Sequence, residues 1–281
     1  MAGTLYLVAT PIGNLGDISL RAEETLREVD FIAAEDTRVT VKLLNHLDIK
    51  KPMVSYYRHN ADTRGDQLLA RMLAGESCAL VTDAGTPAIS DPGEELVALC
   101  AEQGIPVVPI PGACAFVNAL AVSGLPTGRF TFEGFLPMNK KNRRAHLESL
   151  SGEVRTMVFH EAPHKLLATL TDLREAFGPD RRISLCRELT KLHEEVVRTT
   201  LGQAVERYTA QPPKGEFVLV VEGAPPAKEE TVTLEDGLAM VERLREEGAS
   251  TRDAVKQAAA ACGLSRKALY DLAVSGRREG D

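Results

Sequence analysis

Short apolar stretches alternate with helical patterns through the first 124 residues, and this alternation constrains the fold more than any other feature. Strands are expected at Leu5–Ala9, Phe31–Ala34, Met53–Ser55, Cys78–Thr82 and Val107–Ile110. Helical patterns fall between them, at Leu20–Val29, Val39–Leu47, Gln67–Leu73 and Glu94–Gln103. Such alternation is typical of a mainly parallel sheet with helices on its faces. We therefore expect an α/β domain over residues 1–124.

A second α/β domain is expected over residues 125–224, after a break at Gly124-Leu-Pro-Thr-Gly128. Its strands are expected at Phe130–Glu133, Thr156–Phe159, Ile183–Cys186, Val196–Thr199 and Phe217–Val221. Its helices are expected at Arg143–Leu150, Lys165–Phe177 and Leu201–Ala210. These strands recur less regularly than those of the first domain, which favours a mixed sheet.

A small helical module is expected at the C-terminal end, over residues 234–281. Residues 225–233 resemble a linker, because this region contains two adjacent prolines and mixed charges. Of three short helices, the last two are Thr251–Cys262 and Ser265–Ser275, separated by Gly263-Leu264. Ser265 is placed to cap the second of them. This spacing resembles a helix-turn-helix; the alternative is a helical cap or a dimer contact.

The composition limits where nucleic acid could bind. A net charge of −7 excludes a protein that coats nucleic acid generally, so any such site must be a local patch. Tryptophan is absent, which disfavours binding of single strands by rows of stacking rings. The five cysteines show no metal-ligand spacing and indicate reduced thiols. No apolar run approaches ~18 residues, so we expect a cytoplasmic protein without a membrane span.

Four loops rich in glycine, proline and polar residues follow predicted strands. They are Thr10–Asn14, Glu35–Arg38, Asp83–Gly93 and Pro111–Ala115. Ligands of α/β proteins bind beyond the carboxyl ends of the strands, so these loops predict a small-molecule site. Neither a dinucleotide fingerprint nor a P-loop is present. The alternative is that they are ordinary turns, with Ser90 and Asp91 capping the helix that begins at Glu94.

Several long motifs carry a resemblance to a known family. They are Val8-Ala-Thr-Pro-Ile-Gly-Asn-Leu-Gly-Asp-Ile-Ser19, Ala34-Glu-Asp-Thr-Arg38, Asp83-Ala-Gly-Thr-Pro-Ala-Ile-Ser-Asp-Pro-Gly93, Pro109-Ile-Pro-Gly112 and Glu161-Ala-Pro-His-Lys165. Together they resemble the tetrapyrrole (corrin/porphyrin) methylase superfamily, and more narrowly its branch that acts on small-subunit ribosomal RNA. The resemblance covers essentially the whole chain. It implies a homodimer with a cofactor cleft between two α/β domains. It also implies S-adenosylmethionine-dependent 2′-O-ribose methylation of one cytidine in the decoding region of 16S rRNA, with the small ribosomal subunit as the expected partner.

The resemblance also implies which residues bind S-adenosylmethionine. From the first domain these are Pro11 and Ile12 of the first turn, Asp83, Gly85, Ala88 and Ile89 of the third loop, and Cys114 and Ala115 of the fourth. From the second domain they are Ala162 and Leu189. The porphyrin enzymes usually have Gly-Asp-Pro in the third loop, where this chain has Asp83-Ala-Gly-Thr-Pro87.

Methyl transfer to a ribose hydroxyl gains from a general base, which contributes roughly 10²–10⁴-fold. The candidates are Asp36, His59, Glu161 and Glu188, with Arg38 placed to pair with Asp36. A salt bridge or a helix cap is the alternative role for each. Displacement at a sulfonium requires no metal, and none is expected.

A basic run at 138–146 is the best candidate for contact with RNA phosphates. Its four cations are Lys140, Lys141, Arg143 and Arg144, and the C-terminal module adds Arg266 and Lys267. A solvated surface is the alternative. Two other functions remain open: a methylase of a small tetrapyrrole-like substrate, or a non-enzymatic nucleic-acid-binding regulator. The basic run and the helical module favour RNA over a tetrapyrrole, and a regulator leaves the four loops without a purpose.

Overall fold

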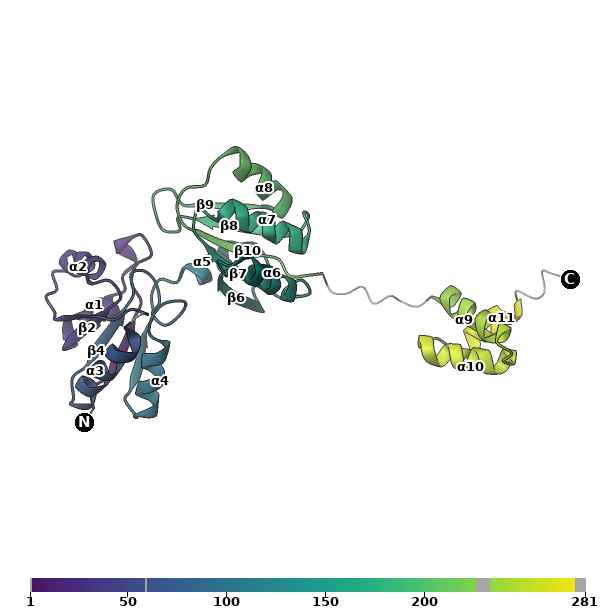
Figure 1. Cartoon of the computed structure of the whole chain (residues 1–281), viewed down its shortest axis with the longest axis horizontal. Helices are drawn as coiled ribbons and strands as arrows, with labels where there is room; N and C mark the ends of the chain where they lie inside the picture. The colour runs from purple at the N-terminus through teal and green to yellow at the C-terminus, as the bar shows by residue number, and fades with distance from the viewer. Residues whose placement is uncertain (1, 59, 226–232, 276–281) are drawn as a thin grey trace. The chain divides into compact units, whose positions relative to one another are not determined.

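The chain forms two compact units, residues 1–224 and residues 225–281 (Figure 1). The structure is a computed structural model, and it describes residues 2–58, 60–225 and 233–275. Within these ranges, no helix is both long enough and apolar enough to cross a membrane.

A parallel five-stranded sheet forms the first half of the larger unit. Its strands are β1 (Leu5–Val8), β2 (Phe31–Ala34), β3 (Met53–Ser55), β4 (Cys78–Val81) and β5 (Val107–Ile110). Their order is β3-β2-β4-β1-β5, and every pair is parallel. All five strands therefore end at the same edge of the sheet. Each is short and apolar, as expected for strands covered on both faces.

Helices cover both faces of this sheet. The helices are α1 (Leu20–Glu28), α2 (Thr37–His46), α3 (Ala61–Leu73) and α4 (Glu94–Glu102), with a short 3-10 turn η1 (Leu15–Asp17) before α1. Leu26 of α1 and Leu44 of α2 share one core with Ile32 of β2. Met72 of α3 and Leu96 of α4 share a second core on the opposite face. The predicted α/β layering is confirmed.

The second half of the larger unit contains a mixed sheet, as the irregular strand spacing predicted. Its strands are β6 (Phe130–Phe135), β7 (Thr156–Glu161), β8 (Arg182–Arg187), β9 (Glu195–Thr200) and β10 (Phe217–Val221), in the order β6-β7-β10-β8-β9. Strands β6 and β7 are parallel, whereas the other neighbours are antiparallel.

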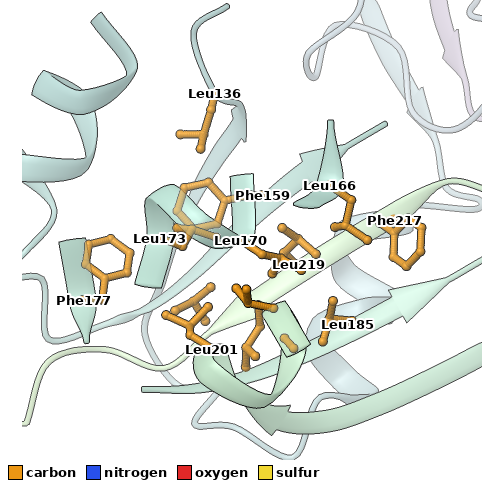
Figure 2. Packing of buried hydrophobic residues seen from close by; sticks show 14 of the residues in the cluster. Leu136, Phe159, Leu166, Leu170, Leu173, Phe177, Leu185, Leu201, Phe217 and Leu219 are labelled. Carbon is orange, nitrogen blue, oxygen red and sulfur yellow. The ribbon is translucent and has the colours of Figure 1, made fainter. Parts of the chain in front are cut away.

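The two faces of the mixed sheet are covered from different parts of the chain. One face packs against α6 (Lys140–Ser149), α7 (Leu166–Phe177) and α8 (Leu201–Ala210). Figure 2 shows this core, where Phe159 and Leu219 of the sheet meet leucines of α7. The other face packs against α5 (Ala115–Val122), whose Ala119 and Leu120 contact the opposite side of β7 and β10.

The sequence pattern predicts no helix over residues 115–122. All of them except Asn118 are apolar, so they show no alternation of an apolar and a polar face. Periodicity cannot identify a short segment of this kind. Helix α5 begins at the last residue of the fourth predicted loop and therefore joins the predicted loops of the first half to the sheet of the second.

The described part of the smaller unit consists of three helices: α9 (Leu234–Glu246), α10 (Thr251–Cys262) and α11 (Arg266–Ser275). Val241, Val255 and Leu269, one from each helix, share its core. Helix α10 ends at Gly263, whose φ of +64° is the left-handed conformation that glycine favours. The hydroxyl of Ser265 accepts a hydrogen bond from the N–H of Ala268, as expected for a cap.

Candidate functional site

The four predicted loops meet at the carboxyl edge of the parallel sheet and are hydrogen-bonded to one another. Thr10 N–H donates to the Gly85 carbonyl at 2.9 Å, and Gly85 N–H donates to the Thr10 carbonyl at 3.0 Å. These bonds join the first loop to the third. The Thr86 hydroxyl donates to the carbonyl of Ala113 at 3.3 Å, which joins the third loop to the fourth.

The second loop is joined to the third through carboxylates. Asp36 N–H donates to Oδ1 of Asp83 at 3.2 Å, and Asp83 N–H donates to Oε2 of Glu35 at 3.3 Å. The side chains of Glu35 and Asp83 are thus held by backbone donors from the neighbouring loop. The four loops form one connected platform.

The third loop has an unusual backbone. Gly85 has a φ of +86°, and Ala88 and Ser90 adopt φ of +67° and +65° although they carry side chains. Residues held in this region cluster at ligand sites. Helix α4 begins after Gly93 without a side-chain cap. Capping by Ser90 and Asp91 is therefore wrong, and both side chains line a cavity instead.

That cavity has a volume of about 460 Å³ and is walled by the loops, by α5 and by the mixed sheet. Most residues expected to bind the cofactor lie in its wall: Ile12, Asp83, Gly85, Ile89, Cys114, Ala115, Ala162 and Leu189. Pro11 and Ala88 belong to the same loops but do not line it. The size is within the range of small-molecule sites.

The rest of the wall was not among the residues expected to bind the cofactor. It comprises Glu35, Ala84, Thr86, Ser90, Asp91, Phe116, Phe135, His160, Pro163, Cys186, Lys191, Glu216, Phe217 and Val218, together with the candidate base Glu188. The first five belong to the second and third predicted loops, whereas Phe116 comes from α5 and Phe135, His160, Cys186, Phe217 and Val218 come from strands of the mixed sheet. The loop composition gave no signal for the residues of α5 and of the strands, because their exposure to the cavity depends on strand pairing.

Three carboxylates give one side of the cavity an unfavourable concentration of negative charge. Burial raises the pKa of Glu35 and of Asp83. Burial also raises the pKa of Asp91 to about 6, and the charges of Glu35 and Asp83 add to this rise. A bound cation would relieve this repulsion.

The lysine in the wall is already neutralised. Lys191 Nζ lies 2.9 Å from Oε1 of Glu188 and 2.8 Å from Oε2 of Glu216. The N–H of Glu216 donates to Glu188 at 2.9 Å and, with Lys191, lowers the pKa of that carboxyl. The wall as a whole is therefore negative.

The predicted catalytic residues are not gathered in one place. Asp36 and Arg38 do not line the cavity; Arg38 donates to both carboxylate oxygens of Asp36 and lowers its pKa to about 2. Glu161 lines the cavity, but its carboxylate accepts from Ala162 N–H at 2.8 Å and from the Thr169 hydroxyl at 2.5 Å. His59 lies outside the described residues.

The predicted RNA-contacting cations differ in their surroundings. Arg143 Nε lies 2.6 Å from Oδ2 of Asp172, and Arg144 Nε lies 2.9 Å from Oε1 of Glu148. Lys140 and Lys141 are exposed at the start of α6 and form no ion pair with any residue that the structure describes. Arg266 and Lys267 are exposed at the start of α11.

Comparison with protein families assigns both units. Residues 4–205 match the family described as Tetrapyrrole (Corrin/Porphyrin) Methylases. Residues 232–277 match the RsmI C-terminal HTH domain, which agrees with the predicted helix-turn-helix.

Two solved structures share the fold of about four fifths of the chain. Uroporphyrin-III C-methyltransferase from Thermus thermophilus, complexed with S-adenyl homocysteine, has a TM-score of 0.54 and 19% identity over 78% of this chain and 97% of its own. A diphthine synthase has a TM-score of 0.60 and 16% identity over 79% of this chain and 90% of its own.

Several relatives are similar in sequence to this protein over almost its whole length. Ribosomal RNA small subunit methyltransferase I of Synechocystis is 50% identical over 99% of this chain and 100% of its own. The protein of the same name from Halalkalibacterium halodurans is 48% identical over 96% of this chain and 94% of its own, and that from Escherichia coli O157:H7 is 44% identical over 97% and 95%. The chain therefore belongs to the tetrapyrrole methylase family and, within it, to the ribosomal RNA small subunit methyltransferases I.

Proposed function

We propose that this protein is an S-adenosylmethionine-dependent methyltransferase of small-subunit ribosomal RNA, and that it methylates the 2′-hydroxyl of one cytidine in the decoding region of 16S rRNA. The observation that carries the proposal is the cavity at the carboxyl edge of the parallel sheet. Eight residues that the resemblance implies for cofactor binding line this one space, from both halves of the larger unit.

The residues of the cavity fit S-adenosylmethionine. The ligand carries a sulfonium and an ammonium, and the wall offers the carboxylates of Glu35, Asp83 and Asp91 to these positive charges. Ile12 and Leu189 offer apolar surface for an adenine ring. His160 adds a buried Nε2 that has no hydrogen-bond partner among the described residues. The cavity thus combines negative charge, apolar surface and an unused polar atom.

The chemistry of the step is an in-line displacement. When bound, S-adenosylmethionine supplies an electrophilic methyl group: the new O–C bond forms as the C–S bond breaks, and its electron pair returns to sulfur. The protein must hold donor and acceptor in line, and such orientation supplies up to ~7–11 kcal/mol in well-aligned cases. It must also accept the proton of the 2′-hydroxyl.

The surroundings of the predicted catalytic residues suggest different roles for them. A carboxylate with a pKa of about 2 is a weak proton acceptor near neutral pH, so Asp36 is better suited to position Asp83, to which its N–H donates. Glu161 holds the turn that presents Ala162 to the cavity. We propose Glu161 and His59 as proton acceptors and the Asp36–Arg38 pair as a positioning unit.

The remaining parts of the proposal concern partners. Membership of the ribosomal RNA branch favours RNA over a small tetrapyrrole, and membership of a methylase family disfavours a non-enzymatic regulator. The exposed cations Lys140 and Lys141 support contact with RNA. We include a homodimer, as the resemblance implies, and a cytoplasmic location, as the cysteine content and the lack of a long apolar run indicate; sedimentation of the purified protein tests the former.

The test is methyl transfer from labelled S-adenosylmethionine to small ribosomal subunits from cells that lack this methylation. We expect one methyl group per subunit, mapped by mass spectrometry to a cytidine ribose of 16S rRNA. The Glu161→Gln and Asp36→Asn variants then separate the roles: loss of the single-turnover rate with unchanged cofactor affinity marks a proton acceptor. Labelling of a base, of a protein or of nothing would refute the proposed reaction.

A further inference from the structure

A second cavity adjoins the first and is unexplained by cofactor binding. Its volume is about 410 Å³, and it is lined by Glu35, Arg58, Ser90, Pro92, Glu133, Gly134 and Phe135. Three of these residues, Glu35, Ser90 and Phe135, also line the first cavity. The two spaces therefore meet at Phe135.

Phe135 is unusual among the large apolar side chains of the site. It is 60% exposed, although its neighbour Leu136 is buried in the core on the other face of the sheet (Figure 2). Isolated exposed apolar residues are common and need no explanation. An exposed aromatic ring in a wall shared by two cavities does need an explanation, because a molecule that enters either cavity can stack on its π face.

A β-bulge places this ring on the cavity side. The pairing of β6 with β7 shifts between Phe132 and Gly134, so that Phe135 rather than Gly134 lies opposite His160. Gly134 adopts a φ of +62°, which only glycine takes up readily. Without the extra residue, Phe135 would be one position out of register with His160 and would face the opposite side. Bulges commonly redirect side chains next to active sites.

The ring of Phe135 ends a row of aromatic side chains. Phe116 stacks on Phe132 with centroids 4.4 Å apart, and Phe132 meets the edge of His160 at 5.2 Å. His160 in turn lies edge-on to Phe135, with centroids 5.4 Å apart and ring planes at 81°. This support from His160 fixes the ring while its own surface stays exposed.

We propose that Phe135 is the platform on which the nucleobase of the methyl acceptor stacks, and that the second cavity holds the acceptor nucleotide. This inference rests on the proposed function, since it requires an RNA acceptor. Bases offer flat π faces that stack on aromatic side chains. Arg58, in the wall of the same cavity, supplies a cation for the acceptor's phosphate. Because Phe135 lines both cavities, a base stacked on it would bring the attached ribose next to the first cavity.

The test compares variants of Phe135 in the intact protein, with small ribosomal subunits from cells that lack this methylation as the acceptor. Phe135→Ala should lower kcat/KM for the subunit by roughly 5- to 150-fold, the range for loss of one stacked base. We expect the loss mainly in KM for the subunit; because Phe135 also borders the first cavity, the affinity for S-adenosylmethionine is measured by calorimetry and should fall much less than kcat/KM for the subunit. Phe135→Tyr and Phe135→Trp should restore kcat/KM, whereas Phe135→Leu should not, because leucine keeps apolar bulk without a ring.

Phe130 provides a matched control. It lies on the same strand, is 39% exposed, contacts Phe116 and lines neither cavity. Phe130→Ala should leave kcat/KM for the subunit unchanged. An unchanged KM in Phe135→Ala, full rescue by leucine, or a fall in S-adenosylmethionine affinity as large as the fall in kcat/KM for the subunit would each overturn the platform. Failure of the unaltered protein to methylate the subunit would instead refute the proposed function, and this inference with it.

Discussion

Thr10 and Gly85 exchange two backbone hydrogen bonds, of 2.9 and 3.0 Å, across loops that are 75 positions apart in the sequence. This isolated antiparallel bridge fixes the third loop against the first, directly beside Ile12 of the cavity wall. Gly85 adopts a φ of +86° in this bridge, a conformation that glycine takes up readily. The backbone of one glycine therefore couples the shape of the cavity to the edge of the parallel sheet.

Gly85→Ala should weaken cofactor binding as well as destabilise the protein. A Cβ at this position makes ordinary van der Waals contacts with the Ile12 methyl Cγ2 at 3.6 Å and the Ala113 carbonyl at 3.9 Å, so the effect comes from the backbone of Gly85, which lines the cavity. The left-handed backbone itself costs a non-glycine residue about 1–2 kcal/mol. We expect a lower thermal midpoint and a reduced affinity for S-adenosylmethionine by calorimetry.

Gly104→Ala separates these two effects. Gly104 has a φ of +67°, and a Cβ there meets no described atom within 4 Å. The Gly104→Ala variant should reproduce the loss of stability without any change in the affinity for S-adenosylmethionine. Equal cofactor affinity in both variants would show that the third loop does not shape the binding site.

The affinity for S-adenosylmethionine should rise as pH rises through about 6. Asp91 has a pKa of about 6 in the folded protein against a usual value of 3.8, so its ionised form is disfavoured in the cavity. A positively charged ligand favours that ionised form and lowers the pKa, so binding releases a proton below pH 6 and none well above it. Calorimetry in two buffers of different ionisation enthalpy counts this proton.

The raised pKa of Asp91 acts in the opposite direction on the folding stability of the protein without S-adenosylmethionine, which should fall as pH rises. A raised pKa means that the Asp91 contribution to stability is fully present below pH 3.8 and is lost as pH rises through about 6. Asp91→Asn should flatten both pH dependences, whereas Asp66→Asn, on the exposed side of α3, should change neither. A proton count that is unaltered in Asp91→Asn would assign the titration to another group.

The sequence predicted the loops of the site far better than its opposite wall. Strands such as Phe31–Ala34 and Phe217–Val221 have their predicted bounds, because fully buried strands are short apolar runs bounded by turns. The loops that follow the parallel strands must meet at one edge, so their residues could be grouped without a structure. Phe135 and His160 could not be grouped, because their pairing across β6 and β7 depends on a β-bulge that no residue pattern predicts.

The sequence also did not predict the acidic partners of the basic run. The run at 138–146 contains no acidic residue, yet Asp172 from α7 and Glu133 from β6 come within 3 Å of Arg143 and His146. Asp172 is 29 positions from Arg143 in the sequence, and Glu133 is 13 positions from His146. The basic run therefore presents less free charge than its composition suggested, and the free charge lies in Lys140 and Lys141.

Lys140→Ala and Lys141→Ala together should reduce the salt dependence of RNA binding. Removing one phosphate-binding cation lowers the slope of log K against log salt by about 0.7–0.9, so the slope of the double variant should fall by about 1.5. Lys50→Ala, an exposed lysine of the first half, should have no effect. An unaltered slope in the double variant would make the start of α6 an ordinary solvated surface.

Arg143→Ala should act on stability rather than on RNA. Its side chain is 19% exposed, and its Nε lies 2.6 Å from the half-buried carboxylate of Asp172, which would be left without this partner. Loss of a charged hydrogen bond of this kind costs roughly 1.5 kcal/mol, measured as a shift in the urea midpoint. A salt slope that falls as much as in the lysine variants, with no loss of stability, would restore Arg143 as a residue that binds phosphate.

Truncation after Pro225 should separate cofactor binding from recognition of the ribosomal substrate. Every described residue that lines the cofactor cavity precedes position 219, and Ala224 is retained because its N–H donates to the Glu153 carbonyl. We therefore expect an unchanged affinity for S-adenosylmethionine and an unchanged thermal midpoint for the larger unit. Methylation of small subunits should fall sharply, because the truncated protein lacks the matched helix-turn-helix and the exposed cations of α11. The full-length variant Arg266→Ala with Lys267→Ala shows whether those cations account for the loss. Full methylation by a folded, truncated protein would make residues 225–281 dispensable for recognition.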